Sequence, residues 1–329
     1  MSEPSTTALP ADRTRRSAVR IDDRMLSIGT VLLLGLLPIW IGSFWLYSIS
    51  LLLAQGIAIL SVSFLIRYSG EVSIGHNFFV ATGAYTIALL QNGPNVPFLG
   101  GVVVATAVSA AVGLLFAWPS RTLSGVYLSV VTLALGLCVP EVLLYWSEVT
   151  GGFEGLFVES RIVGGVASGL QQYYVALAAL CIATFVAHRF RGSRLGLMIL
   201  TARDHPHAAA AFGMTSGSAR LSAFAVSAAI AGFGGSILGF TTSMVSPNSF
   251  IFWNSVTLLV GAVVSLYSTR IYGVVVGAAF VTLVPQLLSN YGQFILIIYG
   301  LALLGVIIVF NVTVPAIVRR VRRRRNHRV

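Results

Sequence analysis

The sequence predicts an all-α, polytopic integral membrane protein that crosses the membrane about ten times. Hydrophobic residues make up 56% of its 329 positions and charged residues only 9%, whereas a soluble domain carries about 25% charged residues. The apolar residues are gathered in runs of about 20, the length at which a helix spans a bilayer. The arginines lie between these runs and near the two ends of the chain, where such residues set membrane topology.

Ten apolar runs are expected to form the crossings, within a membrane domain at 25–311. The run at 74–91 is the weakest, because its opening IGHN is typical of a broken or re-entrant helix. The runs lie at 25–46, 49–66, 74–91, 98–118, 125–147, 171–188, 221–242, 253–269, 272–289 and 293–311.

Arginine placement favours ten crossings over nine. With ten, both termini are cytoplasmic and 20 of the 21 arginines fall on the cytoplasmic side, leaving only Arg161 outside. If 74–91 did not span, either Arg67 or everything after it would lie on the wrong side. Arginine-rich cytoplasmic tails are therefore expected at 1–24 and 312–329, with a cytoplasmic loop at 189–220 and an external loop at 148–170.

The composition also argues against several classes of function. The arginine-rich stretch at 319–325 is typical of an anchor to anionic lipid, not of a nucleic-acid site. Cys138 and Cys181 lie in apolar runs as small hydrophobes, and His205 and His207 have no third ligand near them, so no metal site is expected. Without lysine the chain cannot complete a phosphate-binding loop. With no catalytic constellation in the spans either, neither an enzyme nor a cofactor is expected.

The loop at 189–220 is long enough to contain a helix of its own. Pro206 suits the first turn, helix formers follow as far as Phe212, and Gly213 is typical of a helix end. A short helix across the membrane face is suited to dock in a groove on another protein. A passive interfacial helix is the alternative.

Five blocks of sequence, in order along the chain, resemble the permease family of branched-chain amino-acid ABC importers, the LivM type. The longest block, at 193–235, contains SRLG, ARD, AA, GM, RLSAF and AGFGG in that order. The others are GEVSIGH with TGAY at 70–85, GVY with VTLA at 125–134, TGG with GL at 150–156, and SP with a phenylalanine at 246–250.

In that family the loop after the Arg-Asp pair is the coupling helix that seats in the ATP-binding subunit. The resemblance therefore implies that Ala208, Ala209 and Gly213 form a packing surface for that subunit, and that Arg203 and Asp204 orient it.

The chain departs from the family pattern at three places, which bear on the ATPase partner and on the solute. No glutamate opens the coupling motif near His207, and Leu197 stands where a basic residue is usual. The stretch at 264–268 lacks the usual glycine pair.

Polar residues inside apolar runs predict a translocation path. Most of them lie on or beside the glycine-interrupted run at 74–91, where small residues equally suit close helix packing. Glu141, an acid within the run at 125–147, is suited to bind a substrate ammonium or a partner arginine. The alternative is that it faces the membrane interface. The expected path residues are Ser73, His76, Asn77, Thr82, Thr132 and Glu141.

Two further polar features lie at the ends of spans. Glu71 is expected to cap the third span or to pair with Arg67, since a negative charge favours a helix N-terminus. Thr150, Gly151 and Gly152 in the external loop are expected to face a solute-binding protein, with a plain turn as the alternative.

Together these features predict a permease subunit in the bacterial plasma (inner) membrane. The expected partners are a second permease, homologous or a copy of this chain, two ATP-binding subunits, an extracytoplasmic solute-binding protein and membrane lipid, but no nucleic acid. Branched-chain amino acids are the first expectation for the solute, with urea or short amides, nucleosides or other amphipathic solutes as alternatives. An ATP-independent secondary transporter or channel is the alternative of a different class.

Overall fold

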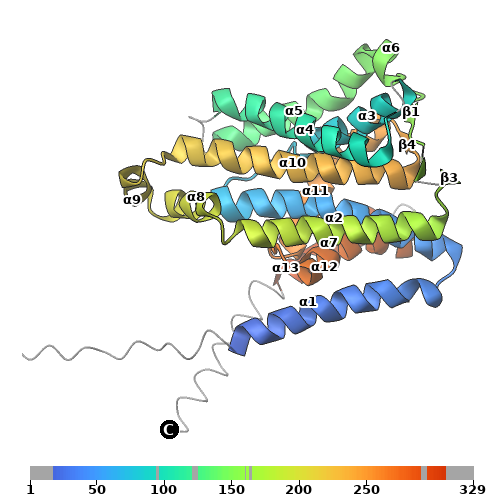
Figure 1. The fold of residues 1–329 in the computed structure, drawn as a ribbon, viewed down its shortest axis with the longest axis horizontal. Helices are drawn as coiled ribbons and strands as arrows, with labels where there is room; N and C mark the ends of the chain where they lie inside the picture. Colours follow the sequence, from blue (N-terminus) through green and yellow to red (C-terminus); the bar gives the residue numbers. More distant parts are fainter. Residues whose placement is uncertain are drawn as a thin grey trace, which may run out of the picture.

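The computed structural model describes residues 18–93, 96–120, 125–159, 161–162, 165–289 and 295–308, and they form a bundle of helices (Figure 1). The helices are α1 (Ala18–Leu36), α2 (Ser43–Ser69), α3 (Asn77–Asn92), α4 (Phe98–Ser120), α5 (Val126–Tyr145), α6 (Ser147–Thr150), α7 (Gly169–Phe190), α8 (Arg194–Asp204), α9 (Pro206–Ala211), α10 (Ser216–Thr242), α11 (Phe252–Val264), α12 (Ile271–Leu287) and α13 (Ile295–Ile308). Two 3-10 turns, η1 (Leu37–Ile39) and η2 (Pro247–Phe250), accompany them. Two antiparallel strand pairs complete the described elements: β1 (Leu156–Phe157) with β4 (Met244–Val245), and β2 (Arg161–Ile162) with β3 (Gly165–Val166).

The described helices confirm the class of an all-α membrane protein. Five of them, α2, α4, α5, α7 and α10, are long and apolar enough to cross a membrane by length and composition. Shorter apolar helices lie at Met25–Ile39, in α11 and in α12. Each of the ten predicted runs contains part of a described helix, and the number of crossings stays a prediction.

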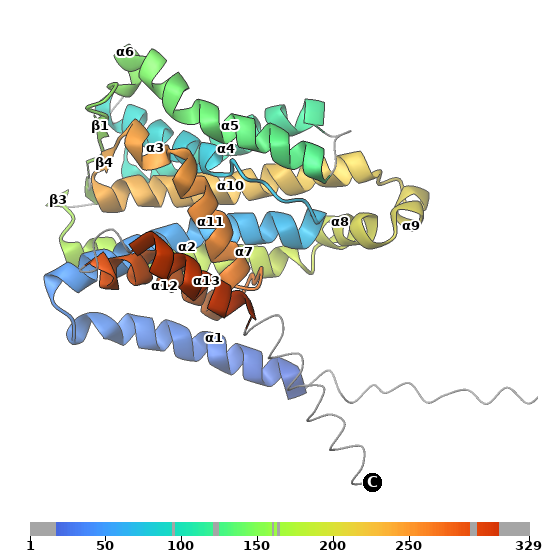
Figure 2. The same cartoon turned by 180° about the vertical axis from the view of Figure 1, so that it is seen from behind.

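The two long loops lie at opposite ends of the bundle. The helices α8 and α9 extend beyond one end, whereas the strands and α6 lie at the other (Figures 1 and 2). Arg191, Arg203 and Arg270 are close enough to Arg67 to act on it electrostatically. Arginines from separate segments that are all predicted to be cytoplasmic therefore gather at the α8–α9 end.

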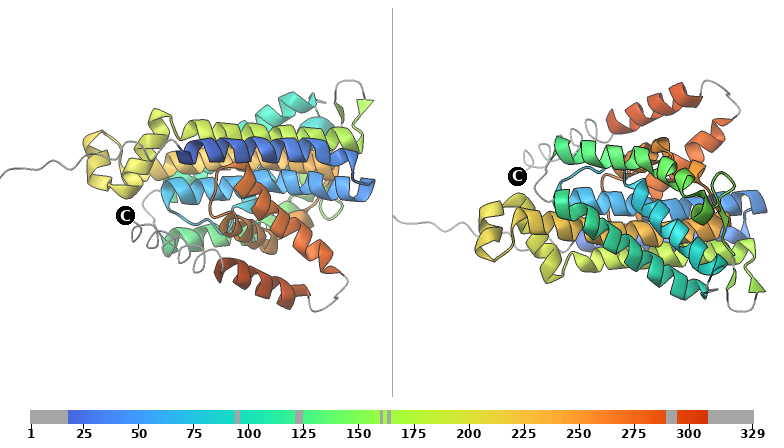
Figure 3. Two further views of the ribbon diagram at one scale, coloured as in Figure 1. Left: turned by 90° about the horizontal axis from the view of Figure 1, so that it is seen from below. Right: turned by 90° about the horizontal axis from the view of Figure 1, so that it is seen from above.

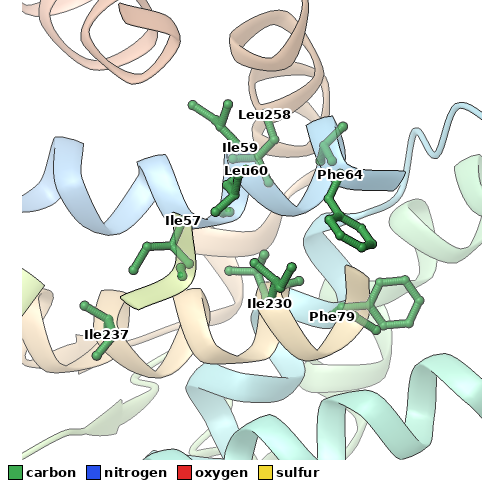
Figure 4. Packing of buried hydrophobic residues seen from close by; sticks show 14 of the residues in the cluster. Ile57, Ile59, Leu60, Phe64, Phe79, Ile230, Ile237 and Leu258 are labelled. Atoms are coloured by element: carbon green, nitrogen blue, oxygen red, sulfur yellow. The ribbon is translucent and has the colours of Figure 1, made fainter. Parts of the chain in front are cut away.

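The core lies along α2 and α10, which contact each other and most of their neighbours. Buried side chains of α2 such as Ile57 and Phe64 lie among those of α3, α10 and α11 (Figure 4). The views from below and from above in Figure 3 show other helices on both sides of α2. A helix that is apolar on all faces belongs in such a central position.

Glycines bring α3 and α10 into backbone contact. A Cβ on Gly83 would lie 2.1 Å from the carbonyl oxygen of Gly232, and one on Gly235 would lie 2.0 Å from the carbonyl oxygen of Val80. No side chain fits at these distances, so small residues are needed for the close packing that holds membrane helices together.

The third predicted crossing is a broken helix that still runs from one end of the bundle to the other. Gly70 ends α2 with a φ of 74°, residues 71–76 are not helical, and α3 begins only at Asn77, whose side chain is buried. This non-helical link passes beside α10 and α5 in Figure 2. At the opposite end, Asn92 Nδ2 donates a hydrogen bond to the Phe157 carbonyl oxygen at 2.7 Å.

Two predicted boundaries were wrong. The run at 25–46 is divided, since η1 ends at Ile39 and α2 begins at Ser43; Pro38, which has no N–H to continue a helix, lies in that turn. The loop at 189–220 is mostly helical, because α8 fills 194–204 and α10 begins at Ser216, well before the predicted start.

The stretch that lacks the usual glycine pair lies at the end of α11. Tyr267 N–H donates to the Ala262 carbonyl and Leu266 N–H to the Val263 carbonyl, both at 2.9 Å, which is the Schellman arrangement that usually has glycine at the position of Leu266. Leu266 and Tyr267 instead take φ values of 55° and 52°. The backbone geometry is kept without glycine, at a cost of about 1–2 kcal/mol per residue.

Replacing Leu266 with glycine is expected to stabilise the protein, because glycine takes a positive φ without steric conflict. Unfolding in detergent should show a free energy of unfolding about 1 kcal/mol higher. The same substitution at Leu32, which is also exposed but lies inside helical α1, should lower it by about 1 kcal/mol. A Leu266→Gly protein that is less stable than the parent contradicts the assignment of strain to this turn.

Candidate functional site

The non-helical link at 71–76 is held inside the bundle by α5. Ser129 Oγ donates a hydrogen bond to the Val72 carbonyl at 3.0 Å, and Ile74 N–H donates to Thr132 Oγ1 at 3.1 Å. Thr132 Oγ1 itself donates to the Ser129 carbonyl at 3.0 Å. Thr132, a predicted path residue, therefore supports the link as an acceptor, while its own hydroxyl hydrogen is used within α5.

Two glycines let the link and α5 meet backbone to backbone. A Cβ on Gly75 would lie 1.8 Å from the Thr132 carbonyl oxygen, and a Cβ on Gly136 would lie 2.8 Å from the Gly75 Cα. The ideal Cβ of Gly136 is also 3.6 Å from Ser255 Oγ on α11. This crossing point therefore brings α5, α11 and the link together.

His76 is fully buried beside the crossing point. Ser227 Oγ donates to the Ser61 carbonyl at 2.7 Å, so its oxygen is left to accept from His76 Nε2, 3.1 Å away. A neutral imidazole with its proton on Nε2 has a bare lone pair on Nδ1. That nitrogen has no partner among the described residues.

Three other buried polar atoms at the break also lack a partner among the described residues. They are Ser73 Oγ, Asn77 Nδ2 and Ser255 Oγ, of which Ser255 was missed from the sequence. A buried polar group without a partner costs about 1–3 kcal/mol, and such groups in a folded protein call for an explanation such as function. We call Ser73, His76, Asn77 and Ser255 the polar cluster.

Two predicted path residues lie apart from the polar cluster. Thr82 Oγ1 donates to the Phe78 carbonyl at 2.9 Å, within its own helix. Glu141 follows Thr132 by nine residues in α5, which at 100° per residue places it on the opposite side of the helix. Thr132 is buried and Glu141 exposed, so this chain does not bring Glu141 together with the polar cluster, and its place on a path stays a prediction.

Glu71 has partners other than the predicted one. Its Oε2 accepts a hydrogen bond from the Gly125 N–H at 2.8 Å, and its Oε1 lies 3.5 Å from Arg220 Nε. The expected pairing with Arg67 was therefore wrong. The carboxylate does lie at a helix N-terminus, but at that of α5, whose N-cap is Gly125.

The predicted helix in the 189–220 loop is confirmed as α9, and its end is well defined. Met214 N–H donates to the Ala209 carbonyl and Gly213 N–H to the Ala210 carbonyl, both at 3.0 Å, with Gly213 at a φ of 82°. This Schellman motif has its usual glycine, unlike the end of α11.

Only part of the predicted coupling surface is exposed. Ala208 and Gly213 are exposed, whereas Ala209 is buried in the chain's own core and helps to hold α9 in place. Phe212, which was not singled out, is 76% exposed between them. An aromatic residue directly before the glycine that ends this helix was the available signal.

The Arg-Asp pair forms the end of α8. Arg203 Nε donates to Asp204 Oδ1 at 2.8 Å, and this hydrogen bond holds the pKa of the Asp204 carboxyl below its usual range. Arg203 Nη1 donates to the Arg67 carbonyl in the last turn of α2. The pair therefore attaches the loop to the end of α2.

The turn at 150–155 is more closed than predicted. Thr150 is buried and its Oγ1 donates to the carbonyls of Leu143 and Trp146. Gly152 is also buried, and Gly151 takes a φ of 75°. Thr150 and Gly152 shape the turn, whose exposed tip is Phe153 and Glu154, and the prediction that this loop faces a solute-binding protein stays a prediction.

A bundle of membrane-type helices with a polar break in one of them, and an exposed helical loop at one end, has the build of a permease. The sequence profile described as the branched-chain amino acid transport system / permease component matches residues 44–312. The chain belongs to this family.

Two relatives carry the same name, the high-affinity branched-chain amino acid transport system permease protein LivM. The protein of Salmonella typhimurium is 30% identical over 267 residues and that of Escherichia coli 28% identical over 267 residues. Each alignment covers 73% of this chain but only 63% of the relative. No solved structure matches the chain significantly.

Thr132→Val is expected to destabilise the link, because it leaves the part-buried Ile74 N–H without an acceptor. The free energy of unfolding in detergent should fall by about 1–3 kcal/mol, and exchange of the Ile74 amide hydrogen should become faster. Thr132→Ser keeps the hydroxyl and should lose much less. Equal stability of the valine and serine variants contradicts the tethering role.

Proposed function

We propose that this chain is the permease subunit of an ABC importer that carries a branched-chain amino acid inward across a bacterial plasma membrane. The observation that carries the proposal is the polar cluster at the break before α3. Broken helices within membrane bundles are common sites for solutes. Membership of the permease family supports the same function.

The chemistry of the polar cluster suits a zwitterionic solute. Asn77 Nδ2 and the hydroxyls of Ser73 and Ser255 offer donors at the N-terminus of α3, whose dipole favours a carboxylate. His76 Nδ1 offers an acceptor for an ammonium N–H. The buried face of α5 beside them carries Leu128 and Val139, which suit an apolar side chain.

The solute reaches such a site only when the bundle moves. The free atoms of the polar cluster are buried, so in this conformation the path is closed around them. Opening alternately toward the two ends of the bundle gives the polar cluster its missing partners, first water and then solute.

The energy for that movement is supplied by other chains. Two ATP-binding subunits dock on the loop at α9 through Ala208, Phe212 and Gly213, and a second permease subunit completes the membrane part. An extracytoplasmic binding protein delivers solute at the Phe153–Glu154 tip. Membrane lipid surrounds the bundle.

Uptake into proteoliposomes tests the function. The chain, reconstituted with its second permease, ATP-binding subunits and binding protein, should accumulate radiolabelled leucine only when ATP is present on the side of the ATP-binding subunits. Accumulation that is independent of ATP and of these subunits would instead identify a secondary transporter.

Asn77→Leu separates transport from folding. Nδ2 has no partner to lose among the described residues, so the free energy of unfolding should not fall. Leucine uptake should fall about tenfold or more, the factor that corresponds to the loss of one hydrogen bond to the solute. Thr86→Val is the matched control in the same helix, because the Thr86 hydroxyl is used within α3, on the Thr82 carbonyl at 2.6 Å. Wild-type uptake by Asn77→Leu argues against a role for the polar cluster.

Phe212→Glu should weaken the docking of the ATP-binding subunits. An exposed aromatic residue at a docking surface commonly contributes more than 1 kcal/mol, so the amount of these subunits that co-purifies should fall about fivefold or more. Phe153→Glu, equally exposed at the other end of the bundle, is the control and should leave co-purification unchanged. If both variants retain the subunits equally, α9 is not the docking element.

A further inference from the structure

The two arginines that flank α9 contact the chain on either side of one glycine. Arg203, at the end of α8, donates to the Arg67 carbonyl before Gly70. Arg220, in the first turns of α10, lies 3.5 Å from the Glu71 carboxylate after Gly70. The exposed loop is thus attached to both sides of the turn that precedes the non-helical link.

The turn itself has the features of a hinge. Gly70 takes a φ of 74°, and its ideal Cβ would lie 3.4 Å from Arg203 Cδ. A cavity of about 170 Å³ adjoins it, lined by residues of the link and of the loop, among them Ser69, Glu71, Arg203, Pro206 and Arg220. The loop therefore has room to shift relative to the end of α2 without a collision.

Glu71 is expected to move with the loop when the loop shifts. Its side chain is largely buried, and a buried charge that loses its partner is strongly unfavourable. A displacement of Arg220 with the start of α10 therefore favours a matching displacement of Glu71.

The link extends any such displacement to the polar cluster. Glu71 Oε2 accepts a hydrogen bond from the N–H of Gly125, the N-cap of α5, and the next residues are joined to α5 through Val72 and Ile74. Ser73 lies between these two attachment points, and His76 follows directly.

We propose that Glu71 is the positioning residue that couples docking at α9 to the opening of the polar cluster, with Gly70 as the hinge. The Glu71–Arg220 ion pair transmits the movement, and the link and α5 move with Glu71 as one body. This inference rests on the proposed transport function and adds the route by which the ATP-binding subunits control it.

Coupling between ATP hydrolysis and uptake tests the route in the complete transporter. Glu71→Gln keeps the size of the side chain and removes its charge, so ATP hydrolysis should persist while leucine moved per ATP falls about tenfold or more. Arg220→Gln should give the same loss, and Arg220→Lys, which keeps the charge, should restore most of it. The double variant Glu71→Gln with Arg220→Gln should be no worse than either single one, because each removes the same ion pair.

Arg194→Gln serves as the control, since Arg194 is exposed in α8 of the same loop and should leave leucine moved per ATP unchanged. If the wild-type transporter works and Glu71→Gln keeps its coupling, the route through Glu71 is overturned while the transport function stands. If the wild-type chain with all its subunits moves no solute, the transport function is overturned and this inference with it.

Hydrogen exchange gives a second reading that does not depend on uptake or on full stability of the variants. In the wild-type complex, a non-hydrolysable ATP analogue should change the exchange of the amides at 71–76, and in Arg220→Gln it should not. Exchange of these amides that is unaffected by nucleotide in the wild-type complex overturns the proposal.

Discussion

The backbone of the link at 71–76 lies inside a bundle of apolar helices, and its polar groups must find partners there. In a helix these groups satisfy one another, but an irregular segment at membrane depth needs side chains or water. Here α5 supplies the partners through Ser129 and Thr132. The break and the position of α3 depend on this pairing, and the buried polar cluster lies beside it.

The same constraint explains why glycine is used where the helices cross. Hydrogen bonds to a backbone require close approach, and the contacts at Gly75 and Gly136 leave no space for a side chain. The sequence suggested both close packing and a polar path near 74–91, and the two interpretations are compatible. The structure shows the close packing directly, and it is this packing that brings the polar atoms together.

Local signals in the sequence predicted much of the fold. Sparse charge and long apolar runs located the helices, and Pro206 with Gly213 predicted both ends of α9 closely. The partners of His76 and Glu71 could not be predicted, because Ser227 and Arg220 lie about 150 residues further along the chain and no local pattern records such contacts. The direction in which Glu141 points could have been predicted, because its position nine residues after Thr132 in the same helix can be read from the sequence.

The hydrogen bonds of the link also set an order in which the chain can settle in the membrane. Val72 and Ile74 bind side chains that follow them by 57 and 58 residues, and a nascent chain is made from its N-terminus. When the segment first emerges, its acceptors and donors are not yet synthesised. The link therefore takes its final form only after α5 has been made and packs against it.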